Sequence, residues 1–214
     1  MRDRFNEELD NLNQSVRETG NLCTEAVSYA SEALMDGNSE KAKDVFSIHR
    51  HIHSSERKIE NASLKLLMEQ QPVAKDLRMI SACLKASYDL ERIGEMSADI
   101  AEIILNENLS ASNDMFDLHS MSCLTIKMMK DTVLALTNRD NDLAEKVIQA
   151  DDTVDDAFNK AKKKIEEHFQ KGANAEYALN LLMVAKYYEK IGDHTVNIAK
   201  WTIFINNGVT PDIN

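Results

Sequence analysis

Residues that interrupt regular structure are scarce in this chain of 214 residues, which has only two prolines and six glycines. Aromatic residues are also few, with five tyrosines, six phenylalanines and one tryptophan. A β-sandwich, a barrel or an α/β fold needs many turns, and turns draw heavily on glycine and proline. The composition therefore favours an all-α fold built from long helices.

The chain also lacks an excess of positive charge and has no long apolar run. The net charge is −11 and the isoelectric point is near 5.0, so the surface repels phosphate backbones and nucleic acid is excluded as a partner. The basic residues are dispersed along the sequence, so we expect no phosphate pocket on this chain. An apolar run of about 18 residues is absent, and residues 1–14 lack the apolar core of a secretory signal. We expect a cytoplasmic protein that meets a membrane only indirectly, through a partner.

The three cysteines, Cys23, Cys83 and Cys123, are far apart and form no C-x-x-C pair. An odd number at such spacing argues against a disulfide framework or a metal set. We expect all three to be small buried apolar side chains in a reducing compartment, which agrees with a cytoplasmic location.

Sequence signatures of enzymes are missing as well. The chain has no P-loop and no G-x-G-x-x-G motif after a strand, and it lacks the Glu-x-x-His pairs of di-iron helical bundles. We therefore expect a protein that is not an enzyme.

Apolar residues recur at intervals of three and four along six segments, which is the period of amphipathic helices. Asp36-Gly37-Asn38 should end the first helix, and Ser39 is a candidate N-cap for the second. Gln71-Pro72 should separate the second helix from the third. The expected helices cover about 3–34, 40–70, 74–106, a segment that follows 107–114 and ends near 136, 143–170 and 175–206.

Two stretches of the chain have nearly the same sequence at a constant offset of 98 residues. Residues 91–102 read ERIGEMSADIAE, and residues 189–200 read EKIGDHTVNIAK. The polar stretch 107–114 is the best candidate for a link between the two copies. We therefore predict two tandem three-helix bundle repeats, residues 1–108 and 109–214, that pack side by side about a pseudo-twofold axis.

Each repeat places ligand-capable side chains four residues apart on two of its helices. Residues at i and i+4 share one helix face, so the acids of each copy of the motif form a stripe around Gly94 or Gly192. The second helices align at an offset of 102 residues and carry two histidines in the first repeat and two aspartates in the second. The candidate site residues are His49, His53, Glu91, Glu95 and Asp99 in the first repeat, and Asp151, Asp155, Glu189 and Asp193 in the second.

Neighbouring second and third helices would bring these pairs together. Like charges at i and i+4 destabilise a bare helix by a few tenths of a kcal/mol, and a bound cation would reverse that sign. Carboxylates and imidazoles are ligands for iron, zinc and manganese. A metal site in each repeat is one reading, and a solvated acidic face is the other. Similarly, the two glycines indicate close approach of either a neighbouring helix or a ligand.

Three stretches resemble the PhoU family: QQPVAKDLR at 70–78, DLERIGEMSADIAE at 89–102 and YYEKIGDHTVNIAKW at 187–201. The resemblance extends from about residue 5 to residue 206. It implies a cytoplasmic, often homodimeric bundle of six helices with no established catalytic activity of its own. It further implies a negative regulator in phosphate homeostasis, whose partners are the ATPase subunit of the phosphate ABC transporter and a phosphate sensor histidine kinase.

Some PhoU proteins bind metal clusters through acidic motifs, which the resemblance carries to Glu91/Glu95, Glu189/Asp193 and Asp151/Asp155. His49 stands where the family usually has aspartate, and imidazole shifts the preference toward iron, zinc or nickel. The equivalence of the two sites is therefore open. The alternatives are a metal-dependent hydrolase or metal-storage bundle, which needs an open coordination position, and a related helical signalling protein with a different partner.

Overall fold

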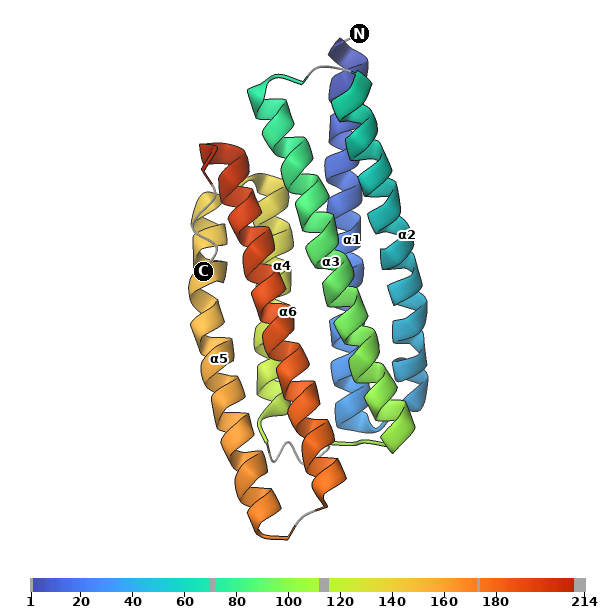
Figure 1. The fold of residues 1–214 in the computed structure, drawn as a ribbon, viewed down its shortest axis with the longest axis vertical. Helices are drawn as coiled ribbons and strands as arrows, with labels where there is room; N and C mark the ends of the chain where they lie inside the picture. Colours follow the sequence, from blue (N-terminus) through green and yellow to red (C-terminus); the bar gives the residue numbers. More distant parts are fainter. Residues whose placement is uncertain (1, 70–71, 112–115, 173, 210–214) are drawn as a thin grey trace.

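The computed structural model describes residues 2–69, 72–111, 116–172 and 174–209, and all regular secondary structure within these ranges is α-helical (Figure 1). The prediction of an all-α fold with six long helices is thus confirmed. The helices are α1 (Arg2–Asp36), α2 (Ser39–Glu69), α3 (Ala74–Glu107), α4 (Leu118–Asn138), α5 (Asn141–Gln170) and α6 (Ala175–Asn207).

The helices form two three-helix bundles that lie side by side. Helices α1, α2 and α3 pack on one another, as do α4, α5 and α6, and the bundles meet where α3 packs on α6 and α1 packs on α4. The end of α2 and the start of α3 lie at one end of the elongated molecule, and the end of α5 and the start of α6 lie at the other (Figure 1). This arrangement confirms two repeats related by a pseudo-twofold axis.

A single apolar core extends through both bundles. Ile52 and Ile93 of the first repeat and Tyr188 and Ile191 of the second are fully buried within it. An amphipathic helix gains most of its stability from burying its apolar face, so each bundle contributes to the stability of the other. The repeat boundary predicted at residue 108 falls at the C-cap of α3, where Asn108 adopts a left-handed conformation.

The helix ends follow the turn chemistry of the sequence, with one correction. Gly37 and Arg139 adopt positive φ at matching places, directly after α1 and α4. Asn38, and not Ser39, caps α2, because its side-chain oxygen accepts hydrogen bonds from the backbone N–H groups of Glu40 and Lys41. Ser39 is already the first residue of the helix.

The two repeats differ most in their first helices, since α1 has 35 residues and α4 only 21. Cys23 and Cys83 are buried as expected, but Cys123 on α4 is exposed, so that part of the cysteine prediction is wrong. Of the helices described here, none has the length and apolar character needed to cross a membrane.

Candidate functional site

The nine predicted site residues lie on two helix pairs, α2 with α3 and α5 with α6, which pack against each other within each repeat. The register of the helices decides which side chains meet. The structure brings together three of the five residues in the first repeat and all four in the second.

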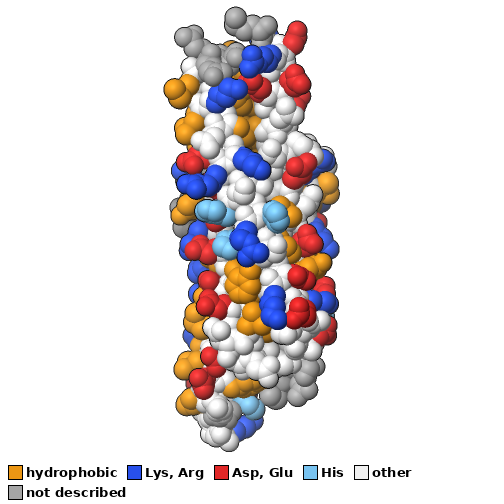
Figure 2. All heavy atoms as spheres, turned by 90° about the vertical axis from the view of Figure 1, so that its right-hand side faces the viewer, with side chains coloured by type: hydrophobic (Ala, Val, Ile, Leu, Met, Phe, Trp, Pro, Cys, Tyr) orange, Lys and Arg blue, Asp and Glu red, His pale blue; other side chains and the backbone are white. Residues whose placement is uncertain are grey.

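In the first repeat, two histidines of α2 converge on one glutamate of α3. His53 Nδ1 lies 2.8 Å from Glu91 Oε1, and His49 Nε2 lies 3.6 Å from the same oxygen. Figure 2 shows imidazole side chains gathered about halfway along this side of the molecule, with basic and acidic side chains around them. Glu91 is largely buried and His53 is exposed, so this cluster opens to solvent on the α2 side.

The other two acids of this stripe point elsewhere. Glu95 forms an ion pair with Arg92 on its own helix, and the hydroxyl of Tyr187 on α6 donates to Asp99. With 3.6 residues per turn, each step of four residues advances about 40° around the helix. The stripe therefore turns from α2 at Glu91 toward α6 at Asp99.

In the second repeat, the charges of four carboxylates act on one another, and two lysines partly compensate them. Lys186 Nζ lies 2.7 Å from Glu189 Oε2, and Lys190 contacts both Glu189 and Asp193. Burial, and then the charges of Asp193 and Asp155, raise the pKa of Asp151 to about 6. The pKa of Asp155 is also raised, by burial and then by Glu189 and Asp193.

The glycine of each motif is where the second helix comes close to the third. A Cβ on Gly94 would lie 2.9 Å from Ile52 Cδ1 and 3.3 Å from His49 Cδ2. A Cβ on Gly192 would lie 3.1 Å from Asp151 Oδ1 and 3.5 Å from Val154 Cγ1. These contacts favour the reading of close helix packing, and this packing holds the ligand-capable residues of α2 and α5 against the motif.

Unsatisfied polar atoms occupy the same positions in both repeats. His49 Nε2 and Glu91 Oε2 in the first repeat, and Asp151 Oδ1 in the second, are buried and have no hydrogen-bond partner among the described residues. Glu189 Oε2 has only its ion pairs with lysines. Buried polar atoms are normally paired, so this symmetric set is suited to a ligand or a partner group.

The donor atoms fit a transition metal in kind, because imidazole nitrogen and carboxylate oxygen are its usual ligands. The positions of these donor atoms, however, do not form a complete ligand set. In the described part of the chain, no group of three or more His, Cys, Asp or Glu side chains is placed to hold a metal ion. Glu95 and Asp193 would have to leave Arg92 and Lys190 to complete a ligand set.

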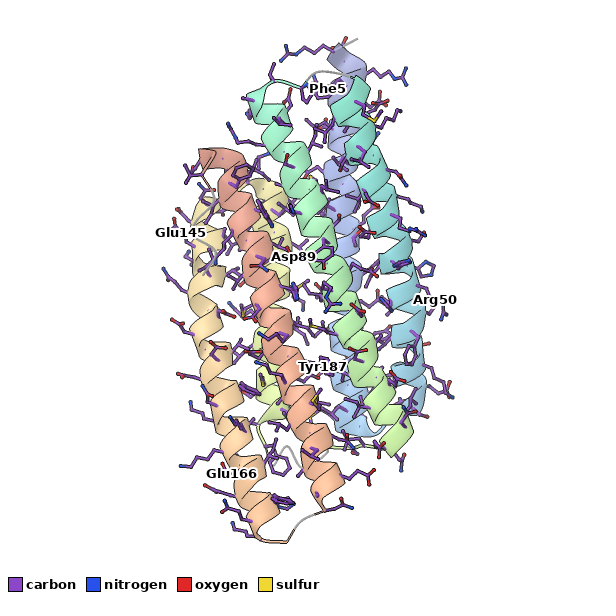
Figure 3. The ribbon with its side chains drawn as sticks, in the orientation of Figure 1. Phe5, Arg50, Asp89, Glu145, Glu166 and Tyr187 are labelled. Carbon is purple, nitrogen blue, oxygen red and sulfur yellow. The ribbon has the colours of Figure 1, made fainter. Side chains whose placement is uncertain are left out.

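A polar contact across the two bundles, which we call the inter-repeat latch, consists of Asp89, His194 and Asn197. His194 Nδ1 lies 2.8 Å from Asp89 Oδ1, and the Asn197 amide donates to the same oxygen at 3.3 Å. Asp89 is only 7% exposed. Figure 3 shows Asp89 and Tyr187 between α3 and α6, at different heights. The latch joins the motif helix of one repeat to the motif helix of the other.

The sequence reasoning missed the latch and the cations beside the motif. A signal for both was present in the repeat. At the offset of 98 residues, Asp89 matches Tyr187 and Asp99 matches Asn197. The bonds across the interface join Asn197 to Asp89 and Tyr187 to Asp99, so they are related by the same repeat. Arg92 also matches Lys190, and each pairs with the second acid of its motif.

The family model described as PhoU domain matches residues 16–104 and again residues 118–202, which together are most of the chain. The chain belongs to the PhoU family. The two matched stretches correspond to the two bundles, so each PhoU domain supplies one motif helix and one ligand-bearing helix to the site.

The relatives carry names from phosphate transport. The chain is 32% identical to the phosphate-specific transport system accessory protein PhoU homolog 1 of Thermotoga maritima, over 95% of this chain and 89% of the relative. It is 31% identical to the PhoU homolog of Pseudomonas aeruginosa, over 96% of this chain and 86% of the relative.

Solved PhoU structures have the same fold. The crystal structure of PhoU from Pseudomonas aeruginosa superposes with a TM-score of 0.90 at 31% identity, covering 96% of this chain and all of that one. The PhoU structure from Streptococcus pneumoniae, described as a phosphate transport system regulatory protein, gives 0.89 at 26% identity over 98% of this chain and all of that one.

Proposed function

We propose that this chain is a cytoplasmic regulator that restrains phosphate uptake and the phosphate-starvation response when phosphate is plentiful. It acts as a helical adaptor, in a homodimer, on the ATPase subunit of the phosphate ABC transporter and on a phosphate sensor histidine kinase. Family membership and the relatives' names support the phosphate-transport role. The comparisons describe accessory and regulatory proteins, which agrees with a role in binding and not in catalysis.

The observation that carries the adaptor proposal is the repeat-symmetric set of unsatisfied polar atoms on the two motif faces. Glu91 Oε2 and Asp151 Oδ1 are buried and have no hydrogen-bond partner among the described residues, whereas Glu189 Oε2 is paired with Lys186. Arginine or lysine side chains of a partner would satisfy these carboxylates and strengthen the contact through charge-assisted hydrogen bonds. The net charge of −11 would steer a basic partner surface toward the chain.

Regulation requires that the two states of a partner bind these faces with different affinity. A ligand with equal affinity for both states shifts nothing, however tightly it binds. We expect the chain to prefer the phosphate-replete state of the transporter, because an adaptor that restrains uptake must stabilise the closed or inactive form.

The test is co-purification of the tagged chain from its own cells, grown in high and in low phosphate, with mass spectrometry of the bound proteins. We expect a phosphate-transporter ATPase or a sensor kinase to be recovered mainly in high phosphate. Recovery of neither protein in either condition would refute the adaptor proposal.

A matched pair of variants assigns the contact to the motif faces. Glu91→Gln with Glu189→Gln removes two charges from the motifs, and Glu7→Gln with Glu145→Gln removes two charges from exposed positions elsewhere. We expect the first variant to lose the partner and the second to retain it. Equal recovery with both variants would show that the contact lies outside the motif faces.

The second part of the proposal concerns metal binding. We propose that His49, His53 and Glu91 hold one iron or zinc ion and that the carboxylates of the second repeat hold another, which would neutralise charge on each face. Metal content of the purified chain, measured by mass spectrometry after loading and dialysis, tests this directly. His49→Ala with His53→Ala should lose one site, and Asp151→Ala with Asp155→Ala the other. Unchanged metal content in both variants would refute this assignment.

A further inference from the structure

An apolar groove lies between α5 and α6, where the end of α5 runs beside the start of α6. Its volume is about 300 Å³, which is enough for one large side chain of a partner. Figure 3 shows Glu166, a residue of its rim, near this end of the molecule and far from Phe5. Its apolar lining consists of Ile165, Phe169, Ala175, Ala178, Leu179 and Leu182.

Large apolar side chains on both sides of the groove are left in water. Phe169 of α5 is 51% exposed, and Leu179 of α6 is 61% exposed. Met183, one turn further along α6, is 46% exposed. Exposed apolar side chains that gather around a hollow mark an interaction site more often than scattered ones do, because a partner that covers them removes their surface from water.

The segment that precedes α4 leaves this groove open. Phe116 meets the ring of His168 edge-on at 5.4 Å, and Asp117 pairs with Lys164. These contacts lie on another side of α5, and none of the four residues lines the groove. Within the described part of the chain, the groove is lined by α5 and α6 alone, so an occupant comes from elsewhere.

The groove continues along the same two helices into the motif face of the second repeat. Lys186, one turn beyond Leu182 on α6, places its ammonium group 5.0 Å from the centre of the Phe158 ring on α5. The same ammonium group pairs with Glu189 at 2.7 Å, and its positive charge acts on Asp155. A series of contacts therefore joins the groove to the four carboxylates of this face, so one bound segment can reach both.

The charge of this surface favours a basic partner segment. Four carboxylates are compensated by two lysines, Lys186 and Lys190, so negative charge is in excess at the motif face. Asp151 Oδ1 is buried there and has no hydrogen-bond partner among the described residues. The rim of the groove is close to neutral, because Lys162 and Glu166 both line it. The groove thus suits an apolar side chain, and the motif face suits positive ones.

We propose that the groove and the motif face of the second repeat together receive one basic amphipathic helix of a partner protein. A large apolar side chain of that helix enters the groove between Phe169 and Leu179, and lysine or arginine side chains further along it pair with Asp151 and Asp155. Phe169 and Asp155 are 14 residues apart on α5, or about 21 Å, so a partner helix of about four turns spans both. The inference rests on the adaptor role proposed above and names the kind of segment that binds one of its faces.

The first test uses the full chain and a designed peptide of about 18 residues, long enough to form a helix, with leucine on one face and lysine elsewhere. A second peptide has the same composition with its leucines distributed around the helix, so the two peptides carry equal charge. A fluorescein label reports binding by anisotropy. We expect the amphipathic peptide to bind at least about tenfold more tightly than the scrambled one. Equal affinity of the two peptides would overturn the proposal, because charge alone would then explain the binding.

Leu179→Glu separates groove binding from attraction to an acidic protein. It should weaken binding of the amphipathic peptide at least about tenfold, although it adds a negative charge that would strengthen a purely electrostatic complex. Leu64→Glu, at an exposed position of the first hairpin, makes the same change in charge and is the matched control. Both side chains are exposed, so circular dichroism should show the fold of the parent. Binding that Leu179→Glu leaves unchanged would refute the proposal.

A second pair of variants tests the acidic half of the contact. Asp151→Asn with Asp155→Asn should weaken binding of the amphipathic peptide by about fivefold or more. Glu7→Gln with Glu145→Gln removes the same charge from exposed positions elsewhere and should have a much smaller effect. Equal losses from the two double variants would show that the peptide responds to net charge and not to this face.

Co-purification from cells grown in high phosphate separates this inference from the adaptor role on which it rests. We expect Leu179→Glu to lose the transporter ATPase or sensor kinase that the parent and Leu64→Glu retain. Recovery of the partner with all three chains would overturn the groove inference and leave the adaptor role standing. Recovery with none of them would count against the adaptor role itself.

Two further outcomes would assign the groove to another occupant and so overturn the proposal. The first is a dimer in sedimentation equilibrium that Leu179→Glu converts to a monomer, while the parent binds no peptide. The groove would then belong to a second copy of this chain. The second is binding to anionic phospholipid vesicles that Leu179→Glu abolishes, again without peptide binding, which would assign the groove to a lipid surface.

Discussion

The two motif faces have the same backbone arrangement but different charge. In the first repeat, two histidines meet one glutamate, so the cluster contains hydrogen-bond donors for its own carboxylate. In the second repeat, the corresponding positions are Asp151 and Asp155, and the compensation comes from lysines of α6. In the first repeat, side chains of the neighbouring helix α2 help to compensate the negative charge of the motif. In the second repeat, the compensating lysines all lie on the motif helix α6 itself.

This difference shows which part of the repeat is structural and which part is free to vary. The glycine, the buried residue that packs on it and the cation three residues before the second acid are shared, because they set the distance between helices and the charge of the motif. The residues at 49 and 151 are not shared, so their identity is open to selection for whatever binds each face. The experiments below test that division.

The largest expected effect concerns the buried residue behind each glycine. Ile52 packs on Gly94 and Val154 packs on Gly192, and both are fully buried. Ile52→Ala should lower the free energy of unfolding by about 2–5 kcal/mol, and Val154→Ala by less, because it removes one methylene fewer. Urea unfolding measures both. A larger loss from Val154→Ala would show that the second repeat, and not the first, is the tighter of the two.

The next effect comes from the glycines themselves. Gly94→Ala places a methyl group against Ile52, and overpacking of about 1–3 kcal/mol outweighs the roughly 1 kcal/mol that alanine gains in a helix. Gly192→Ala meets a movable carboxylate oxygen and should be neutral or stabilising. Thermal unfolding of the two variants checks this, and equal shifts in Tm would contradict the difference in packing.

The third effect depends on pH. The pKa of Asp151 is raised to about 6 from the ordinary value of 3.8, so between these values the folded chain holds a proton that the unfolded chain has released. The contribution of Asp151 to the free energy of unfolding therefore falls as the pH rises from about 4 to about 6. Asp151→Asn should stabilise the chain at pH 7 by about 0.5 kcal/mol and leave it nearly unchanged at pH 4.

Asp156→Asn, at an exposed position of the same helix, is the control for this measurement and should show no such difference between pH 4 and pH 7. Urea unfolding at both pH values gives the comparison. Equal behaviour of the two variants would show that burial at Asp151 does not affect its titration.

The smallest effect concerns the cations of the motif. Lys190 contacts both Glu189 and Asp193, whereas Arg92 pairs with Glu95 alone. Lys190→Gln should cost about 0.5 kcal/mol and Arg92→Gln about half as much, since partly exposed ion pairs contribute little. Both losses should shrink at high salt. A larger loss for Arg92→Gln would mean that the first face also depends on its motif helix for compensation.

The fold could be predicted from the sequence because its signals are local. The helix period, the residues with positive φ such as Gly37, and the repeated motif all act within a few residues of each other. The convergence of His49 and His53 on Glu91 also follows from helix register, once α2 and α3 are neighbours.

Contacts between the bundles could not be predicted in the same way. The latch of Asp89 with His194 joins residues 105 positions apart, and its formation depends on the rotation of α3 against α6. Asp99 bonds Tyr187 on α6 and does not join the cluster on α2. This contact also depends on how the bundles pack, because the direction of a side chain on a long helix depends on where the neighbouring helices lie. The exposure of Cys123 likewise reflects the position of the short α4 in the assembled bundle.

The antiparallel placement of the two hairpins separates their tips by most of the length of the molecule. A helix of 35 residues, such as α1, is about 50 Å long, and the last residues of α2 and of α5 lie at opposite ends of the molecule. Proteins bound at the two ends would therefore be held apart at a fixed distance, and neither would have to leave for the other to arrive.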